Sequence, residues 1–421
     1  MSGNGKRGDI LVIGGGISGL TAAIEAAEAG ANVTVVEKEA FLGGRVARMN
    51  LYFPKMCPPA CGLEINLRRV KTNPRIRTLT LSSVESITGG PGNYKATIRK
   101  TPRFVNTKCT VCGDCVGVCP ATRPNAINLG QDETKAIYLP FEMAYPARFV
   151  IDEAACLGAD ECGKCVDACP YGAIELGMAP ETEEVEVDAV IWSTGWDPPD
   201  AAQFEGLGFG QHANVITNVM MERLTAPGGH TGGKIQRPSD GKAPESVAFV
   251  QCAGSRDENY FKHCSGVCCM ASLKQARYVR EQFPEAQIFV FYIDIRAPGR
   301  LEDFFSAVKE DENLTLIKGK VANITEDSAT GNPTVEAEDT LSGEKVAKEV
   351  DMVVLATGMI PAGIGDTQVE GGVELDEHGF LAIDQPQGYL AAGCAKRPTD
   401  VATCNRDATG VALKALHLSA E

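Results

Sequence analysis

The stretch DILVIGGGISGL, residues 9–20, decides the fold. It begins as a short apolar strand and runs directly into Gly14, Gly16 and Gly19, which are spaced as G-x-G-x-x-G. The Ala-rich segment 20–29 then predicts a helix. The first glycine permits a tight turn, the second lets a pyrophosphate approach the backbone, and the third lets helix and strand pack closely. The stretch therefore predicts a dinucleotide site at a helix N-terminus, where the helix dipole stabilises phosphate charge.

The residues that follow favour FAD as the dinucleotide. A second strand at 32–36 ends at Glu37, whose carboxylate is predicted to accept hydrogen bonds from ribose hydroxyls. The turn Gly43-Gly44-Arg45 resembles the flavoprotein pattern, in which such a turn follows the ribose acid, and we therefore predict FAD rather than NAD. The predicted flavin-binding residues are Gly14, Gly16, Ser18, Gly19, Glu37, Lys38, Gly43, Gly44, Arg45, Thr194, Gly195, Gly358 and Gly393.

Three later strands end in glycine. Two are predicted at 187–191 and 350–355, and a third ends at Gly393. They resemble the successive glycine-ended strands of two-domain flavoprotein reductases of the thioredoxin-reductase type. In those reductases the last motif is usually Gly-Asp, with the Asp touching the ribityl region of the flavin. Cys394 stands at that position here, which puts this one contact in doubt.

Length and composition bound the class of protein. The 421 residues predict two or three domains, and 44% hydrophobic residues supply a core. A net charge of −15 disfavours nucleic-acid backbones and anionic membrane surfaces as partners. No apolar run reaches the roughly 18 residues of a membrane span. Lys6 and Arg7 precede an apolar run too short for a signal peptide, so we expect a cytoplasmic protein, in which the 16 cysteines bind metal or do redox work.

Two cysteine runs predict a two-cluster ferredoxin-like unit. The first run has the spacing C-x2-C-x2-C-x3-C-P, and the second has x5 in its first gap. In two-cluster ferredoxins the fourth cysteine of each run ligates the other cluster. We predict one 4Fe–4S cluster on Cys109, Cys112, Cys115 and Cys169, and a second on Cys156, Cys162, Cys165 and Cys119. A zinc ribbon is the alternative, and the longer gap leaves open a three-iron second cluster.

A third cysteine group lies between a predicted strand at 245–250 and a predicted helix at 270–282. A two-domain reductase would place its NAD(P)H domain here, but no G-x-G-x-x-G occurs. We predict a third cluster, which would replace nicotinamide as the electron partner of the flavin; buried small hydrophobic residues are the alternative. The predicted ligands are Cys252, Cys264, Cys268 and Cys269.

Weaker signals are assigned structural roles. Cys57-x3-Cys61 lies in a Pro-rich turn and is interpreted as structural, because C-x-x-C is the usual redox spacing. Cys394 and Cys404 are interpreted as packing residues. The loop 228–235 resembles a P-loop but lacks its final Ser or Thr, so it is predicted to be an ordered loop.

Together these motifs resemble the A-subunit family of heterodisulfide reductases, above all in the segments 109–120, 251–258, 264–270 and 390–394. The flavin strand is expected to open the chain, without the extra N-terminal domain of larger members. This short form is most similar to the A-subunit of the quinone-interacting membrane-bound oxidoreductase complex of sulfate reducers.

The resemblance implies FAD, iron–sulfur clusters and two partner subunits, of which one is a second iron–sulfur flavoprotein and the other a haem-bearing membrane subunit. It also implies a cytoplasmic location at the membrane, and electron exchange between the quinone pool and adenylylsulfate reductase. In larger relatives the third cysteine group binds a non-standard 4Fe–4S cluster beside the flavin.

The predicted fold class is an α/β, Rossmann-type FAD/NAD(P)-reductase-like flavoprotein with a ferredoxin-like α+β insert. The predicted FAD domain comprises 1–103, 181–225 and 345–421, the insert 104–180, and a degenerate pyridine-nucleotide-type domain 226–344. We predict an oxidoreductase that carries electrons as one component of a larger complex. The alternatives are a soluble heterodisulfide-reductase-type enzyme whose flavin splits an electron pair, a scaffold with structural cofactors, and an NAD(P)H-dependent reductase.

Overall fold

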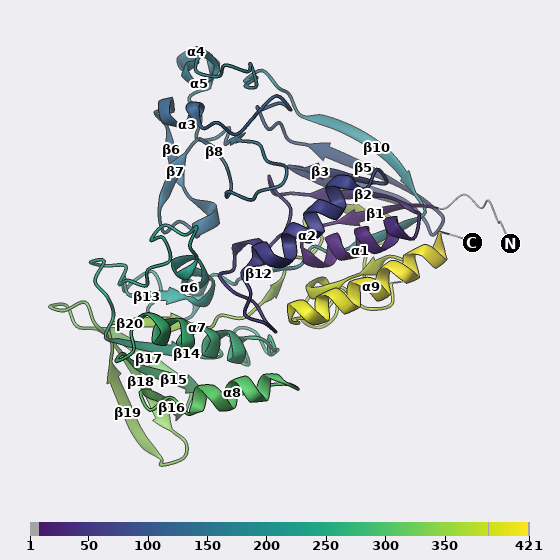
Figure 1. Ribbon diagram of the computed structural model, residues 1–421. Coiled ribbons are helices and arrows are strands. Elements are labelled where there is room, and N and C mark those ends of the chain that lie inside the picture. The colour runs from purple at the N-terminus through teal and green to yellow at the C-terminus, as the bar shows by residue number, and fades with distance from the viewer. Residues whose placement is uncertain (1–7, 386, 420–421) are drawn as a thin grey trace.

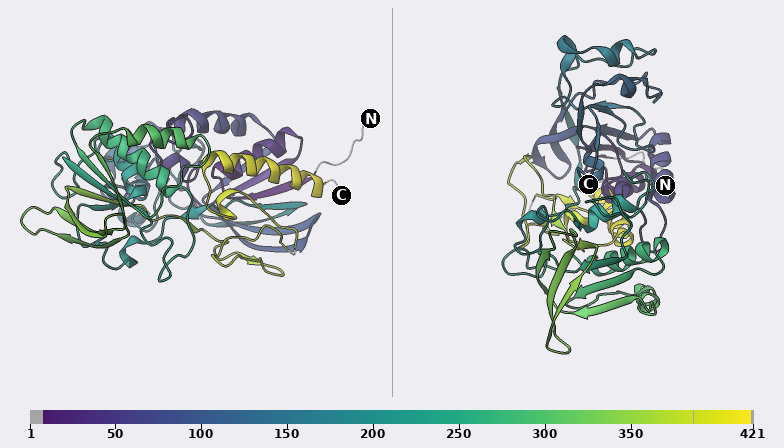
Figure 2. Two further views of the ribbon diagram at one scale, coloured as in Figure 1. Left: turned by 90° about the horizontal axis from the view of Figure 1, so that it is seen from below. Right: turned by 90° about the vertical axis from the view of Figure 1, so that its left-hand side faces the viewer.

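The chain folds around two parallel sheets, and a small cysteine-rich insert interrupts the sequence of the first sheet. The computed structural model describes residues 8–385 and 387–419; Lys6 and Arg7 lie outside this range. In Figure 1 the first sheet and its helices lie to the right, the second sheet lies at the lower left, and the insert projects at the upper left. The right-hand view of Figure 2 also shows the insert projecting from the rest.

The first sheet has five parallel strands in the order β23-β11-β1-β2-β3. The stretch at 9–37 forms β1, helix α1 and β2, which confirms the predicted strand, helix and strand. The bounds are β1 Asp9–Ile13, α1 Ile17–Glu28, β2 Asn32–Glu37, β3 Ile76–Thr80, β11 Ala189–Trp192 and β23 Leu390–Ala391. The strands read as continuous apolar runs because both faces of the sheet are covered.

Helices cover one face of this sheet, and a mostly antiparallel sheet, in which β22 (Gln368–Val369) pairs parallel with its neighbour, covers the other. Small residues let α1 and α9 approach each other closely, since Ala22 and Ala26 share a buried cluster with Ala408 and Ala412. On the opposite face, Trp192 packs with residues of the mostly antiparallel sheet. These covering elements are α2 Pro59–Thr72, α9 Val401–Leu418, β4 Ser82–Gly90, β5 Asn93–Lys100, β10 Glu181–Val187 and β22 Gln368–Val369.

The second sheet is also parallel, in the order β13-β20-β14-β15-β16. Helices cover one face and a three-stranded antiparallel sheet packs on the other. The strands are β13 Val215–Thr217, β14 Ser246–Val250, β15 Gln287–Tyr292, β16 Leu314–Lys318 and β20 Met352–Leu355. The covering elements are α6 Asn218–Thr225, α7 Cys268–Gln282, α8 Leu301–Lys309, β17 Val321–Glu326, β18 Pro333–Asp339 and β19 Glu344–Glu349.

The strand pairing differs from two predicted domain boundaries. The predicted flavin segments 181–225 and 345–421 contain β13 and β20, yet both strands pair within the second sheet. The reason is that a buried apolar strand reads alike in either parallel sheet, so composition does not say which sheet it joins.

The insert is a compact unit of short elements. Helix α3 (Asp114–Val118) and helix α5 (Lys164–Asp167) are the equivalent helices of the two cysteine runs, and they pack on each other. Arg103 anchors the entry to the insert, because its buried guanidinium donates to the Ala40 and Arg148 carbonyls and to the Thr80 hydroxyl. The remaining elements are β6 Thr122–Pro124, β7 Glu133–Lys135, β8 Ile137–Tyr138, β9 Val150–Ile151 and α4 Gly158–Glu161.

Within the described ranges, no helix has both the length and the apolar character needed to cross a bilayer.

Candidate functional site

A cavity of about 1310 Å³ opens where the first sheet meets the second sheet's helices. It exceeds the roughly 300–1,000 Å³ of ordinary small-molecule sites, which suits a ligand as long as a dinucleotide. Its wall is built by the ends of β1 and β2, the turn after β11, the start of α7, and the segment from Cys394 into α9.

The first glycine turn forms one wall as the motif requires. A Cβ atom on Gly14 would lie 2.3 Å from the Ser193 carbonyl oxygen, and one on Gly19 would lie 1.9 Å from the Gly14 carbonyl oxygen. Both glycines are therefore needed for packing. Gly16 differs, because the nearest atom to its Cβ would be the Gly44 Cα at 3.9 Å. The open space beside Gly16, at the N-terminus of α1, fits a ligand that approaches the backbone closely.

The second glycine turn packs directly on the first. The Gly43 amide donates to the Gly15 carbonyl at 2.8 Å, and a Cβ on Gly44 would lie 2.9 Å from the Gly16 Cα. Gly43 and Gly44 have φ values of 111° and 55°, which favour glycine. The two glycine motifs are thus one structural unit. This packing explains why both motifs are present in the same chain.

Glu37 lies at the end of β2 on the cavity wall. Its carboxylate accepts hydrogen bonds from the Gly15 amide at 2.7 Å and the Glu39 amide at 2.8 Å. Burial raises the pKa of the Glu37 carboxyl, and the two amide hydrogen bonds oppose this shift. Each carboxylate oxygen has further lone pairs, so the backbone contacts orient an acceptor that can also receive ribose hydroxyls.

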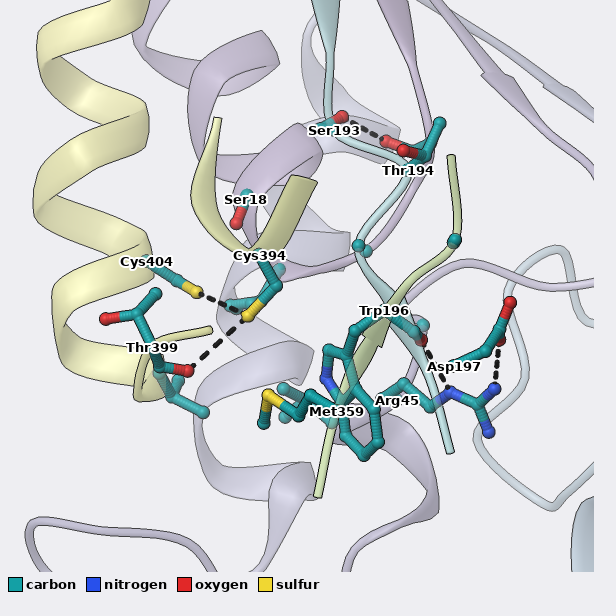
Figure 3. A pocket seen from close by; sticks show the side chains of 18 of the residues that line it. Ser18, Arg45, Ser193, Thr194, Trp196, Asp197, Met359, Cys394, Thr399 and Cys404 are labelled. Carbon is teal, nitrogen blue, oxygen red and sulfur yellow. Dashed lines mark hydrogen bonds and ion pairs between the residues drawn. The ribbon is translucent and has the colours of Figure 1, made fainter. Parts of the chain in front are cut away.

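Arg45 connects the second glycine turn to β12 (Trp196–Asp197), the short strand that follows β11. Its Nε donates to the Trp196 carbonyl at 3.2 Å, and its guanidinium pairs with Asp197 and lies over the Trp196 ring. Figure 3 shows these three side chains together at the cavity. Gly195 precedes them with a φ of 78°, and no atom lies within 4 Å of its would-be Cβ, so the backbone there is open to a ligand.

Most of the predicted flavin residues line this cavity. Those that do so are Gly14, Gly16, Ser18, Glu37, Lys38, Gly44, Arg45, Thr194 and Gly195. Gly19, Gly43 and Gly393 do not line the cavity. Cβ atoms on Gly19 and Gly393 would contact the lining residues Gly14 and Ser18. Gly358 follows β20 in the second sheet and does not line the cavity, and a Cβ there would meet the Ser255 hydroxyl at 2.4 Å. Its neighbour Met359 lines the cavity in its place.

Sequence reasoning missed several wall residues. Trp196, Met359 and Cys404 line the cavity, although no motif singles them out as ligand contacts. They come from segments that lie far apart in the sequence, and only the fold brings them to one wall. The cysteine at 394 is the one available signal, because it replaces an expected Asp beside the flavin.

The third cysteine group lies against the same cavity. Cys252 follows β14 with a φ of 56°, while Cys268 and Cys269 begin α7. The neighbouring residues Gly266 and Val267 form part of the cavity wall.

The four thiols of this group influence one another. Burial raises the pKa of the Cys252 thiol to about 11, and the Cys269 and Cys264 thiols add to the shift. Burial and the other three thiols also raise the pKa of Cys268. The four sulfurs are close enough to interact electrostatically, and a cationic metal centre would favour their thiolate forms.

In the insert, the structure brings the first predicted set together. Cys109, Cys112, Cys115 and Cys169 line one small cavity of about 20 Å³. Burial raises the pKa of the Cys115 thiol to about 11, with contributions from the Cys109 and Cys112 thiols. The fourth cysteine of the second run has thus joined the first three of the first run, as a two-cluster ferredoxin arrangement requires.

The second predicted set is gathered in part. Burial raises the pKa of the Cys165 thiol, and the Cys156 and Cys119 thiols each contribute to the shift. Cys162 is the C-cap residue of α4, the helical turn formed by the extra residues of the longer gap. The insertion is therefore accommodated as a helical turn beside the predicted second cluster.

All 16 cysteines lie in the described ranges, and all are free thiols. Within those ranges, no three His, Cys, Asp or Glu side chains are spaced to hold a single metal ion.

Comparison with known proteins agrees with both halves of the site. Residues 9–59 match the family model described as FAD dependent oxidoreductase, and residues 108–173 match the model described as 4Fe-4S dicluster domain. The solved structures of thioredoxin reductases from T. acidophilum and Lactococcus lactis share the fold. Their TM-scores are 0.53 and 0.54 at 15% and 12% identity, and each match covers 98% of this chain and 99% of the other. The chain is thus an oxidoreductase of the two-domain flavoprotein class with a dicluster insert.

More specifically, the chain is similar over nearly its whole length to the A-subunits of heterodisulfide reductases. It is 38% identical over 418 residues to the iron-sulfur A-subunit of CoB--CoM heterodisulfide reductase from Methanocaldococcus jannaschii, and 39% identical to the second such A-subunit of Methanopyrus kandleri. The A-subunit of the H(2):CoB-CoM heterodisulfide,ferredoxin reductase from Methanothermobacter marburgensis is 36% identical over 422 residues. Each alignment covers 96% of this chain and 63% of the relative, so the chain spans somewhat under two-thirds of their length. The resemblance to heterodisulfide reductase A-subunits that the motifs indicate is therefore confirmed.

Proposed function

We propose that the chain binds one FAD and three iron–sulfur clusters and passes electrons between them as one subunit of a larger oxidoreductase. The flavin would supply chemistry that accepts or releases an electron pair, and the clusters would carry single electrons. The protein residues bind, orient and insulate these groups. Cys252, Cys264, Cys268 and Cys269 would hold the cluster nearest the flavin.

One observation carries this proposal: the loop and helix start bearing the third cysteine group form a wall of the flavin cavity. In the reductases that share this fold class, that position belongs to a pyridine-nucleotide domain. Here the loop after β14 contains Cys252 instead of a glycine motif. A cluster at this wall would exchange electrons with the flavin without a diffusing nicotinamide.

The position of the insert supports a longer chain of centres. Arg223 of α6 donates to the Asn128 side chain of the insert at 3.0 Å and to the Arg48 carbonyl of the flavin unit at 3.2 Å. Phe141 of the insert packs edge-on against Phe41 at a centroid distance of 5.0 Å. The insert is thus anchored to both other units, and its two predicted clusters would lie on a fixed path from the flavin to the surface.

For the biological role, we propose a component like that of the quinone-interacting complex of sulfate reducers. Its partners would be a second iron–sulfur flavoprotein and a haem-bearing membrane subunit, and adenylylsulfate reductase would exchange electrons with it. The resemblance of the sequence to the A-subunit of that complex supports this choice. The protein would then be cytoplasmic and held at the membrane by its partner.

The second candidate is a soluble heterodisulfide-reductase-type complex in which the flavin splits an electron pair. The homologues favour it, since the Methanothermobacter relative is named for both a heterodisulfide and a ferredoxin. A redox titration separates the two roles: pair-splitting requires two well-separated one-electron couples at the flavin, whereas simple relay does not.

Anaerobic purification with flavin, iron and sulfide analysis tests the core proposal. We expect one FAD and about twelve irons per chain, from three four-iron sites. Addition of NADH should leave the flavin oxidised, because the nucleotide-binding glycines are missing. A colourless protein loaded with zinc, or rapid flavin reduction by NADH, would contradict the proposal.

A further inference from the structure

Two cysteines outside the predicted clusters meet at the flavin cavity. The Sγ atoms of Cys394 and Cys404 lie 3.8 Å apart, and both residues line the cavity wall. Only 6% and 4% of their surfaces are exposed. Figure 3 shows the two sulfurs pointing toward each other, with Ser18 and Met359 nearby. Neither cysteine belongs to a predicted ligand set.

Three elements bring these sulfurs together: the turn at Gly393, helix α1 and helix α9. Gly393 begins the short 3-10 turn that follows β23 and has a φ of 62°, and its would-be Cβ would lie 2.1 Å from the Ser18 hydroxyl and 3.2 Å from the Cys404 sulfur. Only glycine permits this close approach of strand end, α1 and α9. Cys404 lies in the first turn of α9, behind the cap that Asp400 provides. The rigid elements therefore hold both thiols at one place on the wall.

The surroundings of the two thiols are unequal. A hydrogen bond from the Cys394 thiol lowers the pKa of Cys404, and the Ser18 hydroxyl adds to the effect. The same hydrogen bond and burial raise the pKa of Cys394. The position of Cys404 near a helix N-terminus also favours its thiolate. The two sulfurs are thus in unlike surroundings, and the single hydrogen of the Cys394 thiol has two acceptors in reach, the Cys404 sulfur at 3.8 Å and the Thr399 carbonyl at 3.4 Å.

We propose that Cys394 and Cys404 are a redox-active dithiol that closes reversibly to a disulfide and exchanges an electron pair with the flavin. On closing, one S–S bond forms, and the two thiols release two protons and two electrons. Oxidised FAD takes up both electrons and both protons and becomes reduced FAD, and the reverse step opens the disulfide. The sulfurs must approach from 3.8 Å to about 2.0 Å, which side-chain rotation can supply.

The pair would let the flavin store or deliver two electrons in addition to those that its own ring and the clusters hold. Electron exchange between the dithiol and the flavin rests on the proposed flavin site. Formation of the disulfide does not depend on that site. The third cysteine group is close by, because Val267 packs against the buried cluster that contains Met359, Cys394 and Cys404. The dithiol thus lies beside both the flavin cavity and the loop of the nearest predicted cluster.

Differential thiol labelling tests disulfide formation in the full chain. The protein, purified without oxygen, is equilibrated in glutathione buffers of increasing oxidation and quenched in acid. Free thiols are alkylated with a light reagent, and thiols released by reduction with a heavy one. We expect Cys394 and Cys404 to become heavy together, without a glutathione adduct. In C404S, Cys394 should remain light or should carry a glutathione adduct that mass measurement before the reduction step detects, whereas C61S should leave the pair unchanged. Light label on both cysteines at the most oxidising poise would overturn the proposal.

A reductive titration tests exchange with the flavin. Oxidised wild-type protein should take up two more electrons per flavin before bleaching is complete than either C394S or C404S. Flavin content and circular dichroism are measured on each variant, so that a folding defect is recognised. Equal electron uptake with flavin bound in all three proteins would overturn the coupling. Absence of flavin from the wild type would instead contradict the proposed function, and the labelling result would stand by itself.

Discussion

Lys274 of α7 and Glu222 of α6 form an ion pair, 2.9 Å from Nζ to Oε1, with side chains only 5% and 9% exposed. Both side chains also form hydrogen bonds to the backbone of the first parallel-sheet unit, at residues 50 and 51. The Lys274 ammonium donates to the Leu51 carbonyl at 2.6 Å, and the Glu222 carboxylate accepts from the Asn50 amide at 3.0 Å. Since Lys274 lines the cavity as well, this pair fixes one parallel-sheet unit against the other beside the proposed flavin site.

Removal of one partner of this pair should be costly. We expect K274M to lower the free energy of unfolding by about 3–5 kcal/mol, because it leaves the Glu222 carboxylate buried and unpaired. The matched control is R277M on the same helix, whose pair with Glu281 is exposed and should contribute about 0.3–0.5 kcal/mol. Denaturant unfolding measures both, and the prediction fails if the two variants lose the same stability.

Two glycines of one motif should behave differently when changed to alanine. G16A should retain the stability of the wild type without flavin, because its Cβ enters open space at an ordinary φ of −75°. It should lose most bound FAD, because that space is where the ligand approaches. G19A should lose stability itself, since its Cβ would overlap the Gly14 carbonyl. Flavin content and thermal unfolding separate the two, and normal FAD content in G16A would contradict the site.

The sequence predicts the first sheet and its glycine turns well, because local chemistry decides them. Gly14, Gly19 and Gly43 each occupy a position that a side chain cannot, so the motif and the backbone carry the same information. The 4Fe–4S dicluster insert is equally local, since its ligands recur at short spacings. Gly358 shows where this reasoning ends, because the strand before it pairs with the second sheet and nothing in its composition distinguishes the two sheets.

Long-range contacts could not be predicted in the same way. Cys394 and Cys404 lie ten residues apart, and only the turn at Gly393 and the start of α9 bring their sulfurs together. The ion pair of Lys274 and Glu222 joins residues of two different helices, and neither belongs to a motif. These contacts depend on how the helices pack on the sheets, and the hydrophobic periodicity of the sequence does not determine that packing.

The third cysteine group should be separable from the insert by iron analysis. C268A should lose about four irons per chain and keep the absorbance of the insert clusters, because its sulfur belongs to the group beside the flavin cavity. C112A should lose about four irons from the insert and leave the flavin environment unchanged. C57A, outside all three predicted sets, serves as the control and should keep all its iron. If C268A keeps a full complement of iron, the third cluster is not held by this group.

His230 should make stability depend on pH below neutrality. Burial lowers the pKa of its imidazole below the ordinary value of 6.5; Arg223 lowers it further, and Asp132 opposes the shift. Its Nδ1 is buried without a hydrogen-bond partner. Because the unfolded chain binds a proton at a higher pH than the folded chain does, the stability that neutral His230 contributes is present above pH 6.5 and is lost as the pH falls through the folded-state pKa. H230Q should therefore lose less stability than the wild type between about pH 7 and pH 5.5, as measured by denaturant unfolding at each pH. Equal losses in the two proteins would show that His230 takes up its proton alike in the folded and unfolded chains.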